Sequence, residues 1–228
     1  MNIEILTRYG PRMLEGLLVT IELVALSVTL GAILAVPIAL ARSSRSRILR
    51  GLSFGYVYFF RGTPLLAQLF LVYYGSGQFR WFFDSIGLWW FFREAFYCAV
   101  LTFTLNTSAY QAEIFRGAIR AIPRDEIDGG LALGLRRWQV FYKIVMPQAL
   151  VIALRPLGNE IVLMIKGSAV AAIVTVFDLM GATRLAFSRS FDISVYLWAA
   201  VLYLILVETL RRVWDYLEYR LTRHLRSV

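Results

Sequence analysis

Cysteine and histidine are nearly absent from this chain of 228 residues, which contains one of each, Cys98 and His224. A single cysteine cannot form a disulfide within the chain, and no CxxC pair offers a zinc site. Cys98 lies inside an apolar run, so we interpret it as a small buried side chain. His224 has no cysteine or carboxylate cluster around it, and we expect no catalytic or metal-binding role for it.

Charged residues are also scarce, at 17% of the chain, whereas 59% of the residues are hydrophobic and the mean hydropathy is +0.63. Soluble domains contain about half apolar residues, and they do not need the long uninterrupted apolar blocks that occur here. The net charge is +9, but the basic residues fall in short clusters between these blocks. That distribution indicates a membrane protein and excludes a nucleic-acid-binding face.

Five apolar blocks predict an all-α polytopic membrane protein with about five transmembrane helices, in which residues 1–228 form a single transmembrane domain. A helix rises about 1.5 Å per residue, so a block of about 20 residues crosses a bilayer. The first block is too long for the apolar region of a signal peptide, and we expect it to be retained. The blocks cover about 14–41, 52–74, 95–115, 149–165 and 195–210.

Three segments interrupt this regular pattern. Phe60–Pro64 places glycine and proline inside the second block, where we expect the helix to be loosened or kinked. Gly75–Glu94 is rich in aromatic residues, which is typical of an interfacial belt. The segment Lys166–Ile193 is apolar but broken by glycines and charges, so it is either a re-entrant pair of short helices or a sixth, imperfect span.

The basic residues are distributed asymmetrically between the two sides of the predicted membrane protein. With five spans, fifteen basic residues fall on one side, in the loop after the first block, in Arg116–Lys143 and in the tail from Arg211. Six fall on the other side. The excess of basic residues marks the cytoplasmic side, so we expect an external N-terminus and a cytoplasmic C-terminus.

The long charged loop of about residues 116–147 carries most of the chemical information. A proline at its start, acidic residues in the first turn and a glycine before two arginines predict a short helix over Pro123–Leu133. A second helix is expected over about Arg136–Val145. Gly129 and Gly130 lie inside the first helix, where each costs about 0.5–1 kcal/mol relative to alanine. Two interpretations remain open, namely close approach of a partner surface and a flexible loop.

This loop resembles the conserved loop of binding-protein-dependent ABC importer permeases, whose pattern is EAA, three residues, Gly, nine residues, Ile, one residue and Leu-Pro. Asp128, Gly129 and Gly130 stand at the EAA positions, and Gly134, Ile144 and Pro147 match in register. The resemblance implies that these six residues form an ATPase-coupling site. The two glycines keep the side chains small, but they weaken the helix.

Flanking sequences narrow the resemblance to polar-amino-acid permeases, in particular the histidine/lysine/arginine/ornithine and octopine/nopaline uptake permeases. The similar segments are Phe60–Leu65, Thr104–Ala109, Glu113–Ile119 and Pro156–Ile161. The resemblance implies a type I ABC importer permease fold in the bacterial inner membrane, and an importer of basic amino acids or opines. Importers of neutral polar amino acids such as glutamine are the alternative within the family.

The resemblance also implies a set of partners. These are a cytoplasmic ABC ATPase dimer, a sister permease subunit, a periplasmic substrate-binding protein, the amino-acid substrate and membrane lipid, with no nucleic acid. The chain lacks a GxxxxGK[ST] pattern, so it is not expected to be an enzyme. We expect no cofactor on this chain, with ATP and magnesium bound by the partner ATPase. An ion-coupled secondary transporter or channel subunit is the alternative of a different class, but it would not need this loop.

Charged side chains within spans are costly and normally face a cavity or one another. Seven fall in or near the blocks, namely Glu22, Arg61, Glu113, Arg155, Glu160, Lys166 and Glu208. Glu160 follows Asn159 in the middle of the fourth block, so we predict that these two residues line the substrate pathway. A carboxylate there would be the natural counter-charge of a cationic substrate. A structural role for Glu160, paired with Arg155, is the alternative.

Overall fold

The computed structural model describes residues 3–222, with the side chains of residues 7–222. Every element in this part of the chain is a helix, so the all-α fold is confirmed. His224 lies outside the described residues. The helices are α1 (Ile3–Arg42), α2 (Arg47–Gly62), α3 (Leu65–Gln78), α4 (Arg80–Ser85), α5 (Trp89–Phe92), α6 (Ala95–Arg120), α7 (Arg124–Ala132), α8 (Arg137–Val140), the π-helix η1 (Phe141–Val145), α9 (Met146–Ser168), the 3₁₀-helix η2 (Ala169–Val174), α10 (Leu179–Ser190) and α11 (Ser194–Thr222).

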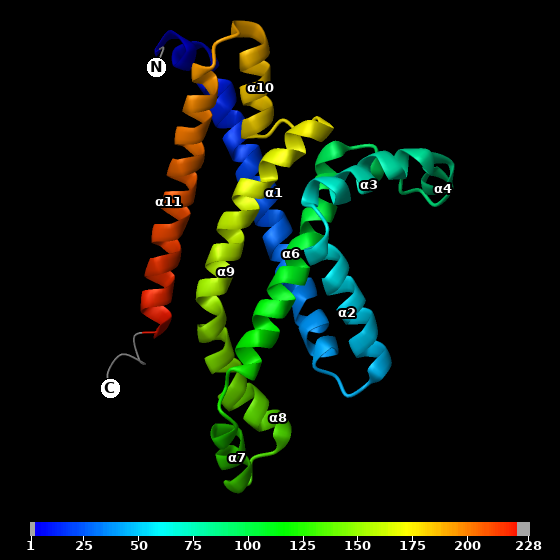
Figure 1. Cartoon of the computed structure of the whole chain (residues 1–228), viewed down its shortest axis with the longest axis vertical. Coiled ribbons are helices and arrows are strands. Elements are labelled where there is room, and N and C mark those ends of the chain that lie inside the picture. The colour runs from blue at the N-terminus through cyan, green and yellow to red at the C-terminus, as the bar shows by residue number, and fades with distance from the viewer. Residues whose placement is uncertain (1–2, 223–228) are drawn as a thin grey trace.

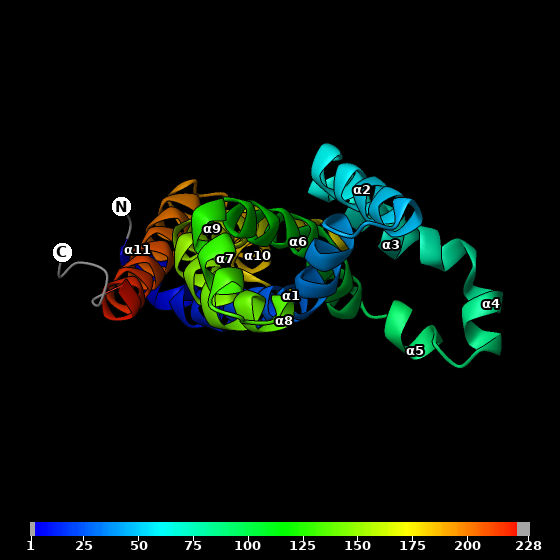
Figure 2. The same cartoon turned by 90° about the horizontal axis from the view of Figure 1, so that it is seen from below.

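The long helices α1, α6, α9 and α11 run along the long dimension of the molecule (Figure 1). The short helix α10 lies at one end of this bundle, and α7 and α8 lie at the opposite end (Figure 1). Helices α3, α4 and α5 project sideways from the bundle, which is clearest when the molecule is seen from below (Figure 2). The loop of residues 116–147, which contains α7 and α8, and the α10 region therefore lie at opposite ends of the bundle.

All five apolar blocks are helical, but they do not become five uniform spans. Among the described residues, three helical runs are long and apolar enough to cross a membrane, namely Thr7–Arg42, Arg137–Val174 and Ser194–Thr222. The second run joins α8, η1, α9 and η2. The predicted separate helix over Arg136–Val145 is therefore continuous with the helix that contains the fourth apolar block. Helix α6 has 26 residues and sufficient length, but it carries a stripe of polar side chains.

The second apolar block is two helices instead of one span. Helix α2 has 16 residues, or about 24 Å, and ends before Thr63 and Pro64. Pro64 cannot donate a backbone hydrogen bond, so the helix breaks here more completely than the expected kink. The carbonyl oxygens released by the break are satisfied, because Gln68 Nε2 donates to the oxygens of Phe60 at 3.0 Å and Thr63 at 3.1 Å.

Small side chains allow α1 to pack closely along α6. Ala35 and Ala39 of α1 form a buried cluster with Ala112 of α6. Toward the α10 end, the two helices pack through larger side chains. Leu23 and Phe103 are completely buried there in the main core cluster. This pairing holds the polar stripe of α6 against its neighbours.

The segment Lys166–Ile193 contains short helices, and the sixth-span alternative is wrong. Helix α10 has 12 residues, or about 18 Å, which is too short to cross a bilayer. Asp178 begins this helix by accepting a hydrogen bond from the Gly181 amide at 2.8 Å. The Leu179 amide donates to Thr20 Oγ1 of α1 at 3.0 Å, which fixes α10 to the first span.

Candidate functional site

Helix α7 begins and ends close to the predicted positions. Pro123 occupies the N-cap position, and Asp125 and Glu126 lie in the first turn, where their charges favour the positive end of the helix dipole. Gly134 has φ +80°, which only glycine adopts without strain, and its amide donates to the Leu131 oxygen at 3.0 Å. The Leu135 amide donates to the Gly130 oxygen at 3.2 Å, which completes a Schellman motif.

The two glycines in α7 have different surroundings. A Cβ atom on Gly130 would lie 2.6 Å from Ile144 Cδ1 and 3.2 Å from Val140 Cγ2, so a side chain at this position would require Ile144 to shift. Gly129 is exposed and would have open space around a Cβ atom. Gly130 therefore lets α7 pack against α8 and η1 of its own chain. Only Gly129 is available to an approaching partner.

Ile144 and Pro147 connect the loop to α9. Ile144 packs against the cluster of Ile122, Val140 and Val145 that fills the space behind α7. Pro147 lies in the first turn of α9, directly after the π-helix η1. Proline clashes with the preceding turn and removes a hydrogen bond, which accounts for the wider turn at that point.

A second contact joins α7 directly to α9. Gln148 Nε2 of α9 donates a hydrogen bond to the Glu126 carboxylate of α7. Together with the packing of Gly130 against Ile144, this bond holds α7 against the start of α9. The segment is therefore a helix packed on its own chain instead of an irregular loop.

The outer surface of the loop presents apolar side chains that the sequence pattern did not identify. Leu133 is 84% exposed, Tyr142 64% and Trp138 58%, and Asp128 of the same loop is also exposed. Exposed large apolar side chains at a polar end of a protein are typical of an interaction surface. For Leu133, the signal in the sequence was its position at the end of α7, directly before Gly134.

A polar stripe on α6 faces the other helices. Thr107 Oγ1 donates to Glu160 Oε1 of α9 at 3.0 Å, and Gln111 Nε2 donates to Thr107 Oγ1 at 3.1 Å and to the Val28 oxygen of α1 at 3.2 Å. Asn106 Nδ2 donates to Gln68 Oε1 of α3 at 2.9 Å. These buried groups link four helices through α6.

Glu160 and Asn159 lie on different faces of α9. Glu160 is 6% exposed and contacts α6, whereas Asn159 is exposed and lines a cavity of about 470 Å³ between α9 and α11. Arg155 Nε pairs with Glu218 of α11 at 2.7 Å and not with Glu160, so the alternative of an Arg155–Glu160 pair is wrong. The structure therefore does not bring the two predicted pathway residues together on one surface.

Two of the remaining charged residues near the spans, Glu113 and Arg61, have partners within the described residues. Glu113 of α6 accepts hydrogen bonds from Arg42 Nε of α1 at 2.9 Å and from Arg116. Arg61 lies over the Tyr110 ring, with its guanidinium carbon 5.1 Å from the ring centroid. These contacts agree with the predicted pairing of charges close to the membrane surface.

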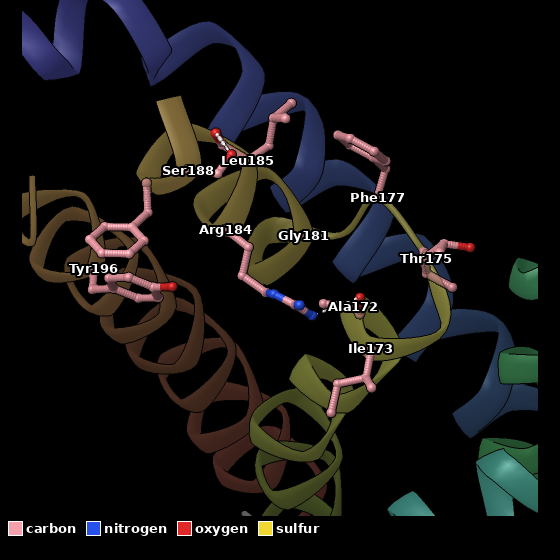
Figure 3. Close-up of a pocket in the computed structure, with 11 residues that line it drawn as sticks. Ala172, Ile173, Thr175, Phe177, Gly181, Arg184, Leu185, Ser188 and Tyr196 are labelled. Carbon is pink, nitrogen blue, oxygen red and sulfur yellow. Dashed lines mark hydrogen bonds between the residues drawn. The ribbon is translucent and has the colours of Figure 1, made fainter. Parts of the chain in front are cut away.

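A cavity at the opposite end of the molecule was not predicted. It has a volume of about 510 Å³ and lies among η2, α10 and the start of α11. Figure 3 shows Arg184 extending from α10 toward η2, where its Nη1 donates to the Ala172 oxygen at 3.2 Å. Its walls include Phe177 and Leu185, which are also shared with a neighbouring cavity.

Comparison with known proteins identifies the class of this helical bundle and its loop. Residues 27–223 match the family of the binding-protein-dependent transport system inner membrane component. The chain belongs to this family. It is a multi-pass membrane permease subunit without ATPase activity of its own, and a separate subunit hydrolyses ATP. Membership implies an ATPase, a substrate-binding protein and a sister permease as partners.

Individual relatives extend over the whole chain. The nopaline transport system permease protein NocM of Agrobacterium fabrum is 37% identical over 228 residues, which cover 100% of this chain and 95% of NocM. The histidine/lysine/arginine/ornithine transport system permease protein HisM of Salmonella typhimurium is 36% identical, with 99% of both chains covered. A crystal structure of an amino acid ABC transporter with histidines is 29% identical, with a TM-score of 0.87, and covers 96% of this chain and 99% of that chain.

Proposed function

We propose that this chain is the permease subunit of an importer for basic amino acids or opines. The observation that carries the proposal is similarity over the full length to permeases named for nopaline and for histidine, lysine, arginine and ornithine. These cargoes share a cationic or guanidinium-like side chain, or a derivative of one. A carboxylate within the bundle is a suitable counter-charge for such a group, and Glu160 supplies one on α9.

The proposed coupling runs from the loop to α9. The ATPase dimer contacts the exposed face of α7 at Asp128 and Gly129, while Gly130, Gly134, Ile144 and Pro147 hold α7 in a fixed orientation on α9. Movement of α7 would then move the span that carries Asn159 and Glu160. ATP and magnesium belong to the partner ATPase, and this chain holds no cofactor.

The proposed orientation places the N-terminus outside and the C-terminus in the cytoplasm of a bacterial inner membrane. The excess of basic residues in the α1–α2 loop, the loop 116–147 and the tail supports it. The separation of α7 and α10 at opposite ends of the bundle is compatible with it (Figure 1). The ATPase would then meet α7 from the cytoplasm, and the binding protein would deliver cargo near the α10 end.

One observation favours neutral polar amino acids as the second candidate cargo. Glu160 already accepts a hydrogen bond from Thr107 and is almost completely buried, so it can serve as an anchor between α6 and α9. A carboxylate with that role does not discriminate between substrates. Neutral cargo such as glutamine would then be transported equally well.

Glu160→Gln separates the two candidates. The amide keeps an acceptor for Thr107 but removes the negative charge, so we expect arginine uptake to require about tenfold more substrate, because a charge-assisted hydrogen bond contributes about 1.5–3 kcal/mol. Glutamine uptake should change less. The measurement is initial uptake rate against concentration for both amino acids in the reconstituted complex.

Thr107→Val is the matched control, since it keeps the Glu160 carboxylate and removes the hydroxyl that donates to it and accepts from Gln111. We expect it to affect both substrates similarly. Equal losses for arginine and glutamine with Glu160→Gln would assign Glu160 a structural role and remove the support that it gives to a cationic cargo.

A further inference from the structure

Three arginines line one small cavity at the α10 end of the molecule. Arg8 and Arg12 lie one turn apart on α1, and Arg189 lies in the last turn of α10. Together with the buried Tyr9 they line a surface cavity of about 500 Å³. The cavity thus combines guanidinium groups from two helices that are far apart in the sequence.

These arginines are not neutralised within the described residues. All three side chains are exposed, and none of them forms an ion pair with any described carboxylate. Arg8 only lies near the Tyr9 ring, 5.5 Å from its centroid. Like charges gathered at one place repel each other, so an anion in the cavity would stabilise the arrangement.

The cluster also opposes the charge pattern of the rest of the chain. Basic residues are concentrated on the side of the loop 116–147, whereas these three lie at the other end. Arg8 and Arg12 directly precede the apolar block that begins at Leu14, and Leu14 itself is 53% exposed. We therefore expect them to lie at the level of the lipid headgroups, at the boundary of the hydrocarbon region.

A second, apolar cavity of about 440 Å³ adjoins the arginines. It shares Arg12 and Arg189 with the first cavity and continues along Gly16 and Val19 of α1 to Phe177 and Leu185, with Glu15 as its one carboxylate. Gly16 and Val19 lie farther along α1 than Arg8 and Arg12, toward the middle of the apolar block. Figure 3 shows Phe177 and Leu185 next to α1 in this region.

We propose that these adjoining cavities form a phospholipid-binding site. The guanidinium groups of Arg8, Arg12 and Arg189 bind the phosphate of the headgroup, since guanidinium and phosphate match in charge and in bidentate geometry. The first part of an acyl chain lies along Val19, Phe177 and Leu185. Even with Glu15 ionised, the site keeps a net positive charge of two, which complements a phosphodiester anion.

An acidic patch on the substrate-binding protein is the competing ligand for the same arginines. It would account for the charge but not for the apolar cavity that continues from it into the bilayer. The combination of a cationic end and an apolar continuation is the shape of a lipid. The proposal does not depend on the cargo.

The test is native mass spectrometry of the purified complete transporter during titration with phosphatidylglycerol, using a variant with Arg8→Gln, Arg12→Gln and Arg189→Gln. We expect this variant to lose one tightly retained phospholipid per copy of the chain and to bind added phosphatidylglycerol about tenfold more weakly. The matched control carries Arg80→Gln and Arg93→Gln, which remove exposed arginines predicted to lie on the same side. It should retain the lipid.

Two further measurements make the result decisive. Arg12→Lys with Arg189→Lys keeps the charge and should recover part of the retention, even if the triple variant is poorly folded. Millimolar inorganic phosphate, added alone, should not displace the lipid, and displacement would identify a site for a small free anion. Unchanged lipid retention together with about tenfold weaker capture of the binding protein would overturn the proposal in favour of a protein-docking surface.

Discussion

Gly129 and Gly130 show how much two adjacent residues can differ in function. Gly130 lies where an added side chain would displace Ile144, whereas Gly129 faces open space. The first is therefore needed for packing within the chain. The second remains free for the proposed contact with the ATPase.

Gly130→Val should uncouple ATP hydrolysis from transport. Overpacking of this kind costs about 1–3 kcal/mol and would displace α7 from η1. Gly129→Ala is the matched control, and it should support normal transport, because alanine stabilises a helix by about 0.5–1 kcal/mol relative to glycine. The measurement is ATPase activity stimulated by the substrate-loaded binding protein, alongside uptake, in the reconstituted complex. Normal coupling in Gly130→Val would mean that α7 is not held in place by this contact.

The sequence indicated which residues belong to the candidate site. It was less informative about the contacts that these residues make. The spacing from Asp128 to Pro147 indicated a functional loop, and the helix ends at Pro123 and Gly134 follow from local backbone chemistry. The pattern could not say that Gly130 faces Ile144, because that contact depends on the path of the chain through η1. For the same reason it placed Glu160 and Asn159 in one pathway, although they lie on different faces of α9.

Helices α2 and α3, with the break between them, depart most from a simple membrane span. The break releases carbonyl oxygens inside the protein, which the side chains of Gln68 and Asn106 then satisfy. Gln68 is 3% exposed and Asn106 6% exposed, so water does not replace these bonds easily. The break is therefore stabilised by α6 as well as by its own ends.

Gln68→Leu should destabilise the joint between α2 and α3. It leaves the Thr63 carbonyl oxygen and the Asn106 amide short of partners, at about 1–3 kcal/mol for each buried group left unsatisfied. Gln78→Leu, at the exposed end of α3, is the matched control and should be neutral. The check is the thermal unfolding temperature of the purified chain in detergent. Equal temperatures for the two variants would show that the joint does not depend on Gln68.

Apolar blocks predicted the existence of the long helices well, because burial in lipid or in a helical core needs a continuous apolar run. Their ends were predicted less well. The fourth block was expected to begin at residue 149, but the helical run begins at Arg137, since the π-helix η1 joins α8 to α9 without a break. A pattern of hydrophobicity does not detect a wider helical turn.

The whole molecule has two functional ends joined by α9. The loop at one end is fixed to the start of α9, and at the other end η2 follows directly from its last turn and leads to α10. A displacement of the loop would therefore move α9 and the segment that follows it. This arrangement fits a subunit in which one side responds to ATP and the other side receives cargo.

Single-cysteine labelling tests the proposed orientation. In a Cys98→Ser background, Phe191→Cys should react with a membrane-impermeant maleimide in intact spheroplasts, because Phe191 is 81% exposed beside α10. Arg45→Cys, in the exposed loop between α1 and α2, should react only after lysis. The reverse pattern would place the loop 116–147 outside the cell and contradict its role in ATPase docking.

The most direct test of the account is uptake into proteoliposomes that contain this chain with its sister permease, ATPase and binding protein. We expect labelled arginine or octopine to accumulate only when ATP is present on the side of the ATPase and loaded binding protein is present on the other side. A non-hydrolysable ATP analogue should stop uptake, and ionophores should leave it unchanged. Uptake that continues without ATP and follows an ion gradient would contradict the account.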